Sequence, residues 1–277
     1  MLFALIARLR PPPLLRPSQQ VLFCWAGALL VAGDAIFWLM FAAVQSDSGL
    51  AGLDGPVHSL LVDSRNPAAT ALLAALTTVT SPETLSVFGG AFALAWALWK
   101  KELWRPAVLM GAMVLAVVLT NLIKQFVSRS RPSTSDFLLG PDDALSFPSG
   151  HTVGVCVFTV VLAYLALSRS GTRTTAVLGF SAAITVTALV GFSRLYLGYH
   201  WLTDVVASFG VALVIAAVAV FTDAARHGSA RHSSVLHGSA LHGSAQNSTV
   251  KGRSGVRKGL AQGSLQVSDQ SAPDAQA

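Results

Sequence analysis

Long apolar runs separated by short polar stretches dominate this sequence, and they restrict it to the membrane proteins. A helix needs about 20 mainly apolar residues to cross roughly 30 Å of hydrocarbon. Six segments have this character: 21–44, 83–99, 106–127, 152–168, 175–193 and 201–221. Only 12% of the 277 residues are charged, about half the share in a typical soluble domain. We therefore predict an all-α integral membrane bundle of six transmembrane helices.

A shorter apolar stretch, residues 67–80, follows the first predicted span and is closed off by Ser81-Pro82. Its uninterrupted apolar part is too short to cross a bilayer. We expect it to form an interfacial or re-entrant helix between the first two spans.

The lysines and arginines fit this topology, because cytoplasmic loops of membrane proteins carry the excess of these residues. With a cytoplasmic N-terminus, fourteen of the nineteen fall on the inner side. The net charge of +6 follows the topology and does not form a patch for nucleic acid, so we predict no nucleic-acid partner. The sequence thus predicts a multi-pass plasma-membrane protein with both termini in the cytoplasm.

The two ends of the chain differ from the predicted six-span domain, residues 21–221. Residues 1–20 read as a cytoplasmic segment rather than a secretory signal, because their charges follow the apolar stretch. Residues 222–277 read as a disordered cytoplasmic tail of low apolar content. A five-residue unit repeats there, starting at His227, His232, His237 and His242. Its spacing suits neither a helix face nor a strand face, so we favour a solvated tail over a metal site.

Asp34 lies in the middle of the first predicted span. An intramembrane carboxylate is a candidate functional residue. The alternative is a carboxyl group that faces a neighbouring helix or stays neutral, and both interpretations remain open.

Cations and imidazoles gather at the predicted outer ends of four spans. Lys124 and Arg131 close the third span, Arg194 closes the fifth, and His151 and His200 open the fourth and the sixth. Arginine forks match the geometry of phosphate oxygens, and lysine adds a point charge. A single binding site for an anion with several oxygens, on the outer face, would explain the positions of all five side chains.

The stretch FPSGHT, residues 147–152, adds a helix N-terminus to this set. Pro148, Ser149 and Gly150 lead directly into an apolar helix, whose free N–H groups and positive dipole end favour an anion. Gly150 permits close approach of the main chain. Ser149 is suited to cap the helix, to bond a phosphate oxygen, or both.

His200 and Asp204 stand four residues apart at a helix start, which places them on one face. A carboxylate bonded to one ring nitrogen orients the imidazole and makes its other nitrogen a better nucleophile or base. A metal site with second-shell support is the alternative, and the Asp142-Asp143 pair keeps it open. The cationic surroundings argue against it, so we predict no metal and no cofactor.

These residues form three blocks: Lys124-x6-Arg131-Pro132, Pro148-Ser149-Gly150-His151, and Ser193-Arg194-x5-His200-x3-Asp204. Together they resemble the signature of the type 2 phosphatidic acid phosphatases, the membrane lipid phosphatase branch of the vanadium haloperoxidase and acid phosphatase superfamily. The resemblance covers about residues 20–221, and the motif positions show no departure from the pattern.

The resemblance implies a role for each matched residue. His200 would attack phosphorus and form a phosphohistidine, and Asp204 would orient it. His151 would protonate the leaving oxygen and then activate water. The phosphate oxygens would be held by Lys124, Arg131, Ser149, Gly150 and Arg194, while Pro132, Pro148 and Ser193 would be structural.

We therefore expect a metal-independent lipid phosphatase whose active site faces the extracytoplasmic leaflet and whose partners are membrane lipids and a lipid phosphate substrate. Undecaprenyl diphosphate, phosphatidylglycerol phosphate and phosphatidic acid are the candidate substrates. A phosphotransferase that passes the phosphoryl group to a lipid or sugar acceptor is one alternative, and a non-enzymatic anion transporter is another. The sequence does not define the oligomeric state or a role for the tail.

Overall fold

The computed structural model describes residues 17–169 and 171–226. Most of the predicted tail and most of the predicted N-terminal segment lie outside these residues, so both remain predictions, but residues 222–226, assigned to the tail, form the end of the last helix. The chain divides into two units, Met1–Ala225 and Arg226–Ala277. The account below concerns the first unit and the end of its last helix.

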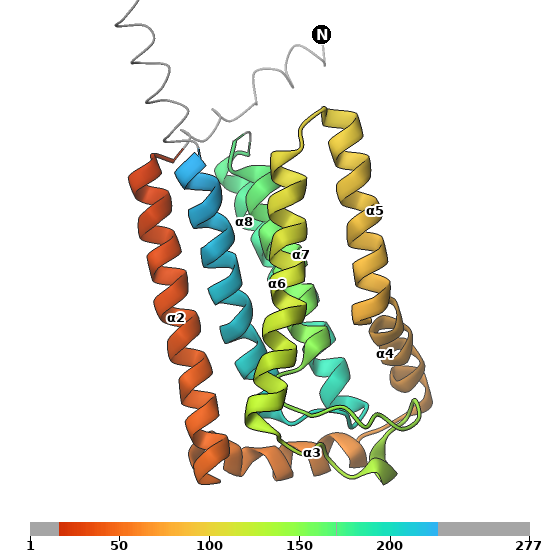
Figure 1. Cartoon of the computed structure of the whole chain (residues 1–277). Coiled ribbons are helices and arrows are strands. Elements are labelled where there is room, and N and C mark those ends of the chain that lie inside the picture. Colours follow the sequence, from red (N-terminus) through yellow and green to blue (C-terminus); the bar gives the residue numbers. More distant parts are fainter. Residues whose placement is uncertain (1–16, 170, 227–277) are drawn as a thin grey trace, which may run out of the picture. The chain divides into compact units, whose positions relative to one another are not determined.

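Every regular element in the described residues is a helix (Figure 1). The long helices are α2 (Gln19–Ser46), α3 (Asp54–Asp63), α4 (Pro67–Val79), α5 (Pro82–Lys100), α6 (Trp104–Val127), α7 (Gly150–Leu167), α8 (Arg173–Tyr196) and a last helix, Leu202–Arg226. Two short 3-10 turns, Gly49–Leu53 and Thr134–Asp136, lie in the connections.

Within the described residues, five helices are long and apolar enough to cross a membrane, namely α2, α6, α7, α8 and Leu202–Arg226. A sixth crossing arises if α4 and α5 count as one span bent by 52°. The predicted all-helical membrane fold is confirmed, although the second crossing differs in detail. Most of residues 67–80 form α4, and a break at Thr80 and Ser81 separates it from α5. The helix that lies across the bundle end between the first two crossings is α3 (Figure 1).

The break between α4 and α5 follows from the residues at that point. The Ser81 side chain accepts a hydrogen bond from the Thr84 N–H at 3.2 Å, and Pro82 occupies the first turn of α5. Proline has no N–H and fixes φ, which suits a helix start and prevents continuation of the preceding helix. Asn66 and Pro67 begin α4 in the same manner, with the Asn66 Oδ1 accepting from Ala69 N–H at 2.9 Å.

The centre of the bundle is formed by α7 and the last helix. More than half of the span window of each is buried, 56% and 61%, against 17% for α2. Val157, Leu165 and Ile215 are among the fully buried side chains between them. The two helices that carry His151 and Asp204 are thus the most firmly packed, which fixes the position of their N-terminal ends.

Four helix ends meet at one end of the bundle. Figure 1 shows that α6 ends there, α7 begins there, α8 ends there and the last helix begins there, with α3 lying across the same end. The connection 128–149 between α6 and α7 runs through this region. All three motif blocks therefore lie at the same end of the bundle.

The contact between α2 and the last helix depends on two glycines. A Cβ atom at Gly210 would lie 2.7 Å from the Gly33 carbonyl oxygen and 2.8 Å from the Phe37 nitrogen. These are backbone atoms, so the helices would have to separate. We expect Gly210→Ala to destabilise the protein by about 1–3 kcal/mol, the usual cost of overpacking, despite the better helix propensity of alanine. Thermal unfolding in detergent micelles measures this change.

Gly27 provides the matched control, because it lies on α2 and a Cβ atom there would meet no atom within 4 Å. Gly27→Ala should leave the unfolding midpoint unchanged or raise it. Equal midpoints for Gly210→Ala and the unmodified protein would contradict the proposed helix contact.

Candidate active site

A cavity of about 570 Å³ opens beside the ends of α5, α6 and α7. Five of the predicted site residues line it: Lys124, Arg131, Gly150, His151 and His200. The other three, Ser149, Arg194 and Asp204, are buried and are not among its lining residues. The structure therefore brings residues of all three blocks to one place, while their chemical roles remain predictions.

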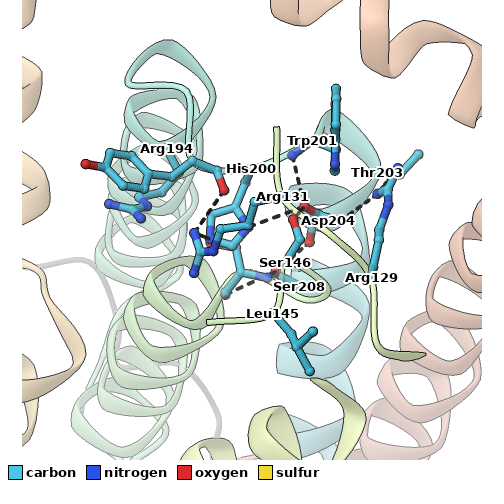
Figure 2. A network of polar contacts seen from close by, with 12 residues as sticks. Arg129, Arg131, Leu145, Ser146, Arg194, His200, Trp201, Thr203, Asp204 and Ser208 are labelled. Atoms are coloured by element: carbon cyan, nitrogen blue, oxygen red, sulfur yellow. Dashed lines mark hydrogen bonds and ion pairs between the residues drawn. The ribbon is translucent and has the colours of Figure 1, made fainter. Parts of the chain in front are cut away.

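The His200–Asp204 pair has the orientation expected from its spacing. His200 Nδ1 lies 3.3 Å from Asp204 Oδ2 (Figure 2). The same carboxylate accepts hydrogen bonds from the Ser146 hydroxyl and from the Trp201 N–H, the latter at 2.9 Å. On the other side of the ring, His200 Nε2 lies 3.4 Å from Arg131 Nη1. Asp204 thus fixes the imidazole so that Nε2 is the nitrogen nearest the arginine.

His200 lies in the short connection between α8 and the last helix, outside the membrane-spanning helices. Complete burial lowers the pKa of His200 well below its ordinary value, and the positive charges of Arg131, Arg194 and Lys124 lower it further. A neutral imidazole keeps an electron pair on one nitrogen. His200 is therefore in the form that a nucleophile requires.

Main-chain carbonyl groups hold the cations of the first block in place. Lys124 Nζ donates to Leu145 O at 2.5 Å, and Arg131 Nε donates to Ala144 O at 2.5 Å. Both acceptors belong to the connection 128–149. The later part of this connection therefore holds two cations at the cavity: Lys124 from the end of α6 and Arg131 from the first residues after it.

Arg194 approaches the same region from α8. Its Nη1 donates to Thr77 Oγ1 at 3.1 Å, and its guanidinium group lies over the Tyr199 ring, 4.3 Å from the ring centre. Its Nε is buried and has no hydrogen-bond partner among the described residues. Arg194 thus retains an unused donor close to the cavity.

Asp142 lines the cavity and lies between two of these arginines. Its Oδ2 is 2.9 Å from Arg131 Nη2 and 3.9 Å from Arg194 Nη2. The Asp142 carboxylate therefore pairs with guanidinium groups that the sequence analysis expected to bind phosphate. Among the described residues, no group of three or more His, Cys, Asp or Glu side chains is placed to hold a metal ion.

The start of α7 differs in part from the prediction for Ser149. The Ser149 side chain makes no capping hydrogen bond; it accepts from the Thr152 hydroxyl at 3.1 Å. The Ser149 N–H donates to Ser208 Oγ at 2.9 Å. Gly150, one residue later, lines the cavity, so the close approach of the main chain that was expected at this point falls on Gly150.

The remaining predicted residues lie away from the cavity surface. Pro132, Pro148 and Ser193 are buried, and the Ser193 hydroxyl donates to Val190 O within α8. Asp34 is exposed on α2 and accepts from Trp38 Nε1 at 3.1 Å. It does not line the cavity.

Sequence reasoning missed the role of Arg129. Arg129 is one of the five lysines and arginines that the predicted topology leaves on the outer side, and its Nη1 lies 2.6 Å from Asp204 Oδ1 (Figure 2). The position of Arg129 in the sequence could have indicated a role. It lies two residues before Arg131 on the predicted outer side, where the positive-inside bias makes arginine uncommon.

The helical bundle defines an integral membrane protein, and the cavity at one end of it is lined by Lys124, Arg131 and two histidines. Residues 105–226 match the model of the PAP2 superfamily. This range contains all three motif blocks, so the resemblance to this superfamily is confirmed.

Two relatives show how far the similarity extends. Phosphatidylglycerophosphatase B of Bacillus subtilis (strain 168) is 23% identical over 186 residues, which cover 65% of this chain and 88% of that protein. Lipid phosphate phosphatase delta of Arabidopsis thaliana is 31% identical over 110 residues, covering 35% of this chain and only 26% of that protein.

A solved structure has the same fold. The crystal structure of a transmembrane PAP2-type phosphatidylglycerolphosphate phosphatase from Bacillus subtilis superposes with a TM-score of 0.61 at 23% identity, covering 70% of this chain and 95% of that chain. The arrangement of the helices is therefore that of a known membrane protein.

Asp142 gives a testable property of the cavity. Asp142→Asn removes a negative charge that competes with phosphate for Arg131 and Arg194. We expect the mutant to bind inorganic phosphate about 3–10-fold more tightly, since a half-exposed ion pair contributes on the order of 1 kcal/mol. Thermal-shift titration of the purified protein with phosphate measures the affinity.

The neighbouring Asp143 serves as the control, because its side chain is exposed and lies outside the cavity lining. Asp143→Asn should not alter phosphate affinity. Weaker phosphate binding by Asp142→Asn would show that Asp142 supports the anion site instead of competing with it.

Proposed function

We propose that this protein hydrolyses a lipid phosphate or diphosphate at the extracytoplasmic face of the membrane through a phosphohistidine intermediate. One observation carries the proposal: His200 and His151 line the same cavity as Lys124 and Arg131. A nucleophile, a second imidazole and cations for the phosphate oxygens are thereby within reach of one substrate.

In the first step, His200 Nε2 would attack phosphorus while His151 donates a proton to the leaving oxygen. A bond forms between nitrogen and phosphorus, the bond to the leaving oxygen breaks, and the lipid departs as an alcohol or a monophosphate. Lys124, Arg131 and the N-terminus of α7 would stabilise the charge on the phosphoryl oxygens, where it develops in the transition state.

In the second step, His151, now neutral, would accept a proton from water, which attacks the phosphohistidine. The bond between nitrogen and phosphorus breaks, inorganic phosphate leaves, and His200 returns to its neutral form. Throughout both steps Asp204 would hold the Nδ1 side of His200 and compensate the positive charge of the phosphorylated ring. No step draws on a metal ion, since the cations of the cavity supply the compensating charge.

The choice of substrate class rests on the membrane fold and on the relatives. The cavity combines the cationic end with apolar residues of two helices, Leu85 of α5 and Met113 and Ala116 of α6, which suits a phosphorylated head group attached to an apolar chain. The similarity to a phosphatidylglycerophosphatase supports phosphatidylglycerol phosphate, and the similarity to a lipid phosphate phosphatase supports the wider class of lipid phosphates, of which phosphatidic acid is a member. Undecaprenyl diphosphate is the diphosphate member of the class.

The sidedness of the site rests on the charge distribution along the sequence. With the N-terminus in the cytoplasm, the bundle end that carries the cavity faces outward, in agreement with the positive-inside bias. The substrate would then belong to the extracytoplasmic leaflet.

The proposal predicts phosphate release from at least one of these three lipids by the detergent-purified protein, with EDTA having no effect. His200→Ala should lower turnover by at least about 10³-fold, the scale of loss when a covalent nucleophile is removed. Release of inorganic phosphate, compared with transfer to an added alcohol acceptor, also separates hydrolysis from phosphoryl transfer.

His58→Gln is the matched control, since His58 bonds to Asp136 at 3.0 Å and does not line the cavity. It should retain turnover. Wild-type turnover in His200→Ala would refute the assignment of the nucleophile.

A further inference from the structure

We propose that Arg129 and Asp54 form a positioning pair that holds the Asp204 carboxylate, and through it His200, in the geometry needed for attack on phosphorus. The inference rests on the proposed function and deepens it, because it adds two residues that are not among the specified positions of the three motif blocks. One of them, Asp54, also lies outside the range matched by the family model.

Arg129 bridges two carboxylates with the two arms of its guanidinium group. Nη1 lies 2.6 Å from Asp204 Oδ1 and Nη2 lies 2.7 Å from Asp54 Oδ2. Nη1 also donates to Thr203 Oγ1 at 2.7 Å. A planar guanidinium group with several short contacts fixes its partners in direction as well as distance.

Asp54 connects this arginine to the start of the last helix. It lies at the N-terminus of α3 and is buried. Its Oδ1 accepts from the Thr203 N–H at 2.9 Å, and its Oδ2 accepts from the Thr203 hydroxyl at 2.6 Å. Asp54 therefore holds both Arg129 and the residue that precedes Asp204, so that α3 is attached to the first turn of the helix that bears Asp204.

The charges of this cluster require Arg129. Asp204 and Asp54 are two buried carboxylates, and a buried charge is costly unless it is paired. The other nearby cations have different partners: Arg131 binds Asp142 and main-chain carbonyl groups, and Lys124 binds Leu145 O. Without Arg129, Asp204 would keep hydrogen bonds from Ser146 and Trp201 but would lose its ion pair.

Neither residue is placed to touch a substrate. Arg129 and Asp54 are absent from the residues that line the cavity. Their influence on the reaction would pass through Asp204 and His200, so they are positioning residues and not catalytic ones. A change there should impair attack by His200 and leave the phosphate-binding cations unaltered.

The binding of two oxyanions distinguishes impaired attack by His200 from weakened phosphate binding, and it can be measured without turnover. Orthovanadate accepts a fifth ligand and so imitates the transition state of attack by His200, whereas inorganic phosphate binds as the tetrahedral ion. We expect Arg129→Gln to weaken vanadate binding about 10–100-fold, because a misplacement on the order of 1 Å costs up to about 10²-fold. Phosphate affinity should change less than about threefold. Thermal-shift or calorimetric titration of the purified protein measures both.

Variants of the pair test the bridge itself. Arg129→Lys keeps the charge but contacts the two carboxylates less well, so its vanadate affinity should lie between those of the unmodified protein and Arg129→Gln. Asp54→Asn should show the same selective loss, and the double variant should lose less than the product of the two single effects because the residues act together.

Arg65→Gln is the matched control. Arg65 is another arginine near this end of the bundle, and it donates to Tyr196 O at 3.0 Å and to Asp136 O at 2.8 Å. Its loss should lower the thermal stability without altering the ratio of vanadate to phosphate affinity. A positioning role for Arg129 would be overturned if Arg129→Gln and Arg65→Gln gave the same ratio, or if Arg129→Gln weakened both oxyanions equally.

Lipid turnover by the same proteins distinguishes this inference from the proposed function. In the active protein, Arg129→Gln should lower kcat with KM within about threefold of its original value. If the unmodified protein releases no phosphate from the three lipids, the proposed function fails, and the selective loss of vanadate still decides the role of Arg129.

Discussion

The buried carboxylate of Asp204 is the contact on which the geometry of the site depends. It joins the His200 ring, the Ser146 hydroxyl, the Trp201 N–H and the Arg129 guanidinium group. These partners come from two connections and the start of the last helix, so one charged group holds together segments far apart in the sequence. A buried ion is favourable only with such complete pairing. The network around it is therefore a condition for placing His200 at the cavity.

The sequence predicted the fold well because membrane crossing imposes a length and a composition on each helix. The central helices α7 and Leu202–Arg226 lie close to the predicted spans 152–168 and 201–221. The second crossing was harder to predict, because Ser81-Pro82 ends one helix and starts the next. A break of this kind is visible in the sequence, whereas the 52° angle between α4 and α5, and with it whether the two count as one crossing, is not.

The candidate site was predictable where spacing determines geometry. Residues 200 and 204 are only four apart, so the start of the last helix and the residues just before it bring them together, and the motif blocks fall at helix ends on one side of the bundle. The pairing of Asp54 with Thr203 and Arg129 was not predictable, since 149 and 75 residues separate the partners. In the sequence, Asp142 likewise enters only the alternative of a metal site, and only the fold places it between Arg131 and Arg194.

The central claim is that a helix-end cavity presents His200 Nε2 to a phosphoryl group. Rapid quenching of the purified protein during turnover of a lipid phosphate, followed by peptide mass spectrometry under alkaline conditions, tests it most directly. The account predicts a phosphoryl group on His200, stable in base and lost in acid. A phosphoryl group on another residue, such as Ser149, or a burst of phosphate with His200 unmodified throughout, would contradict it.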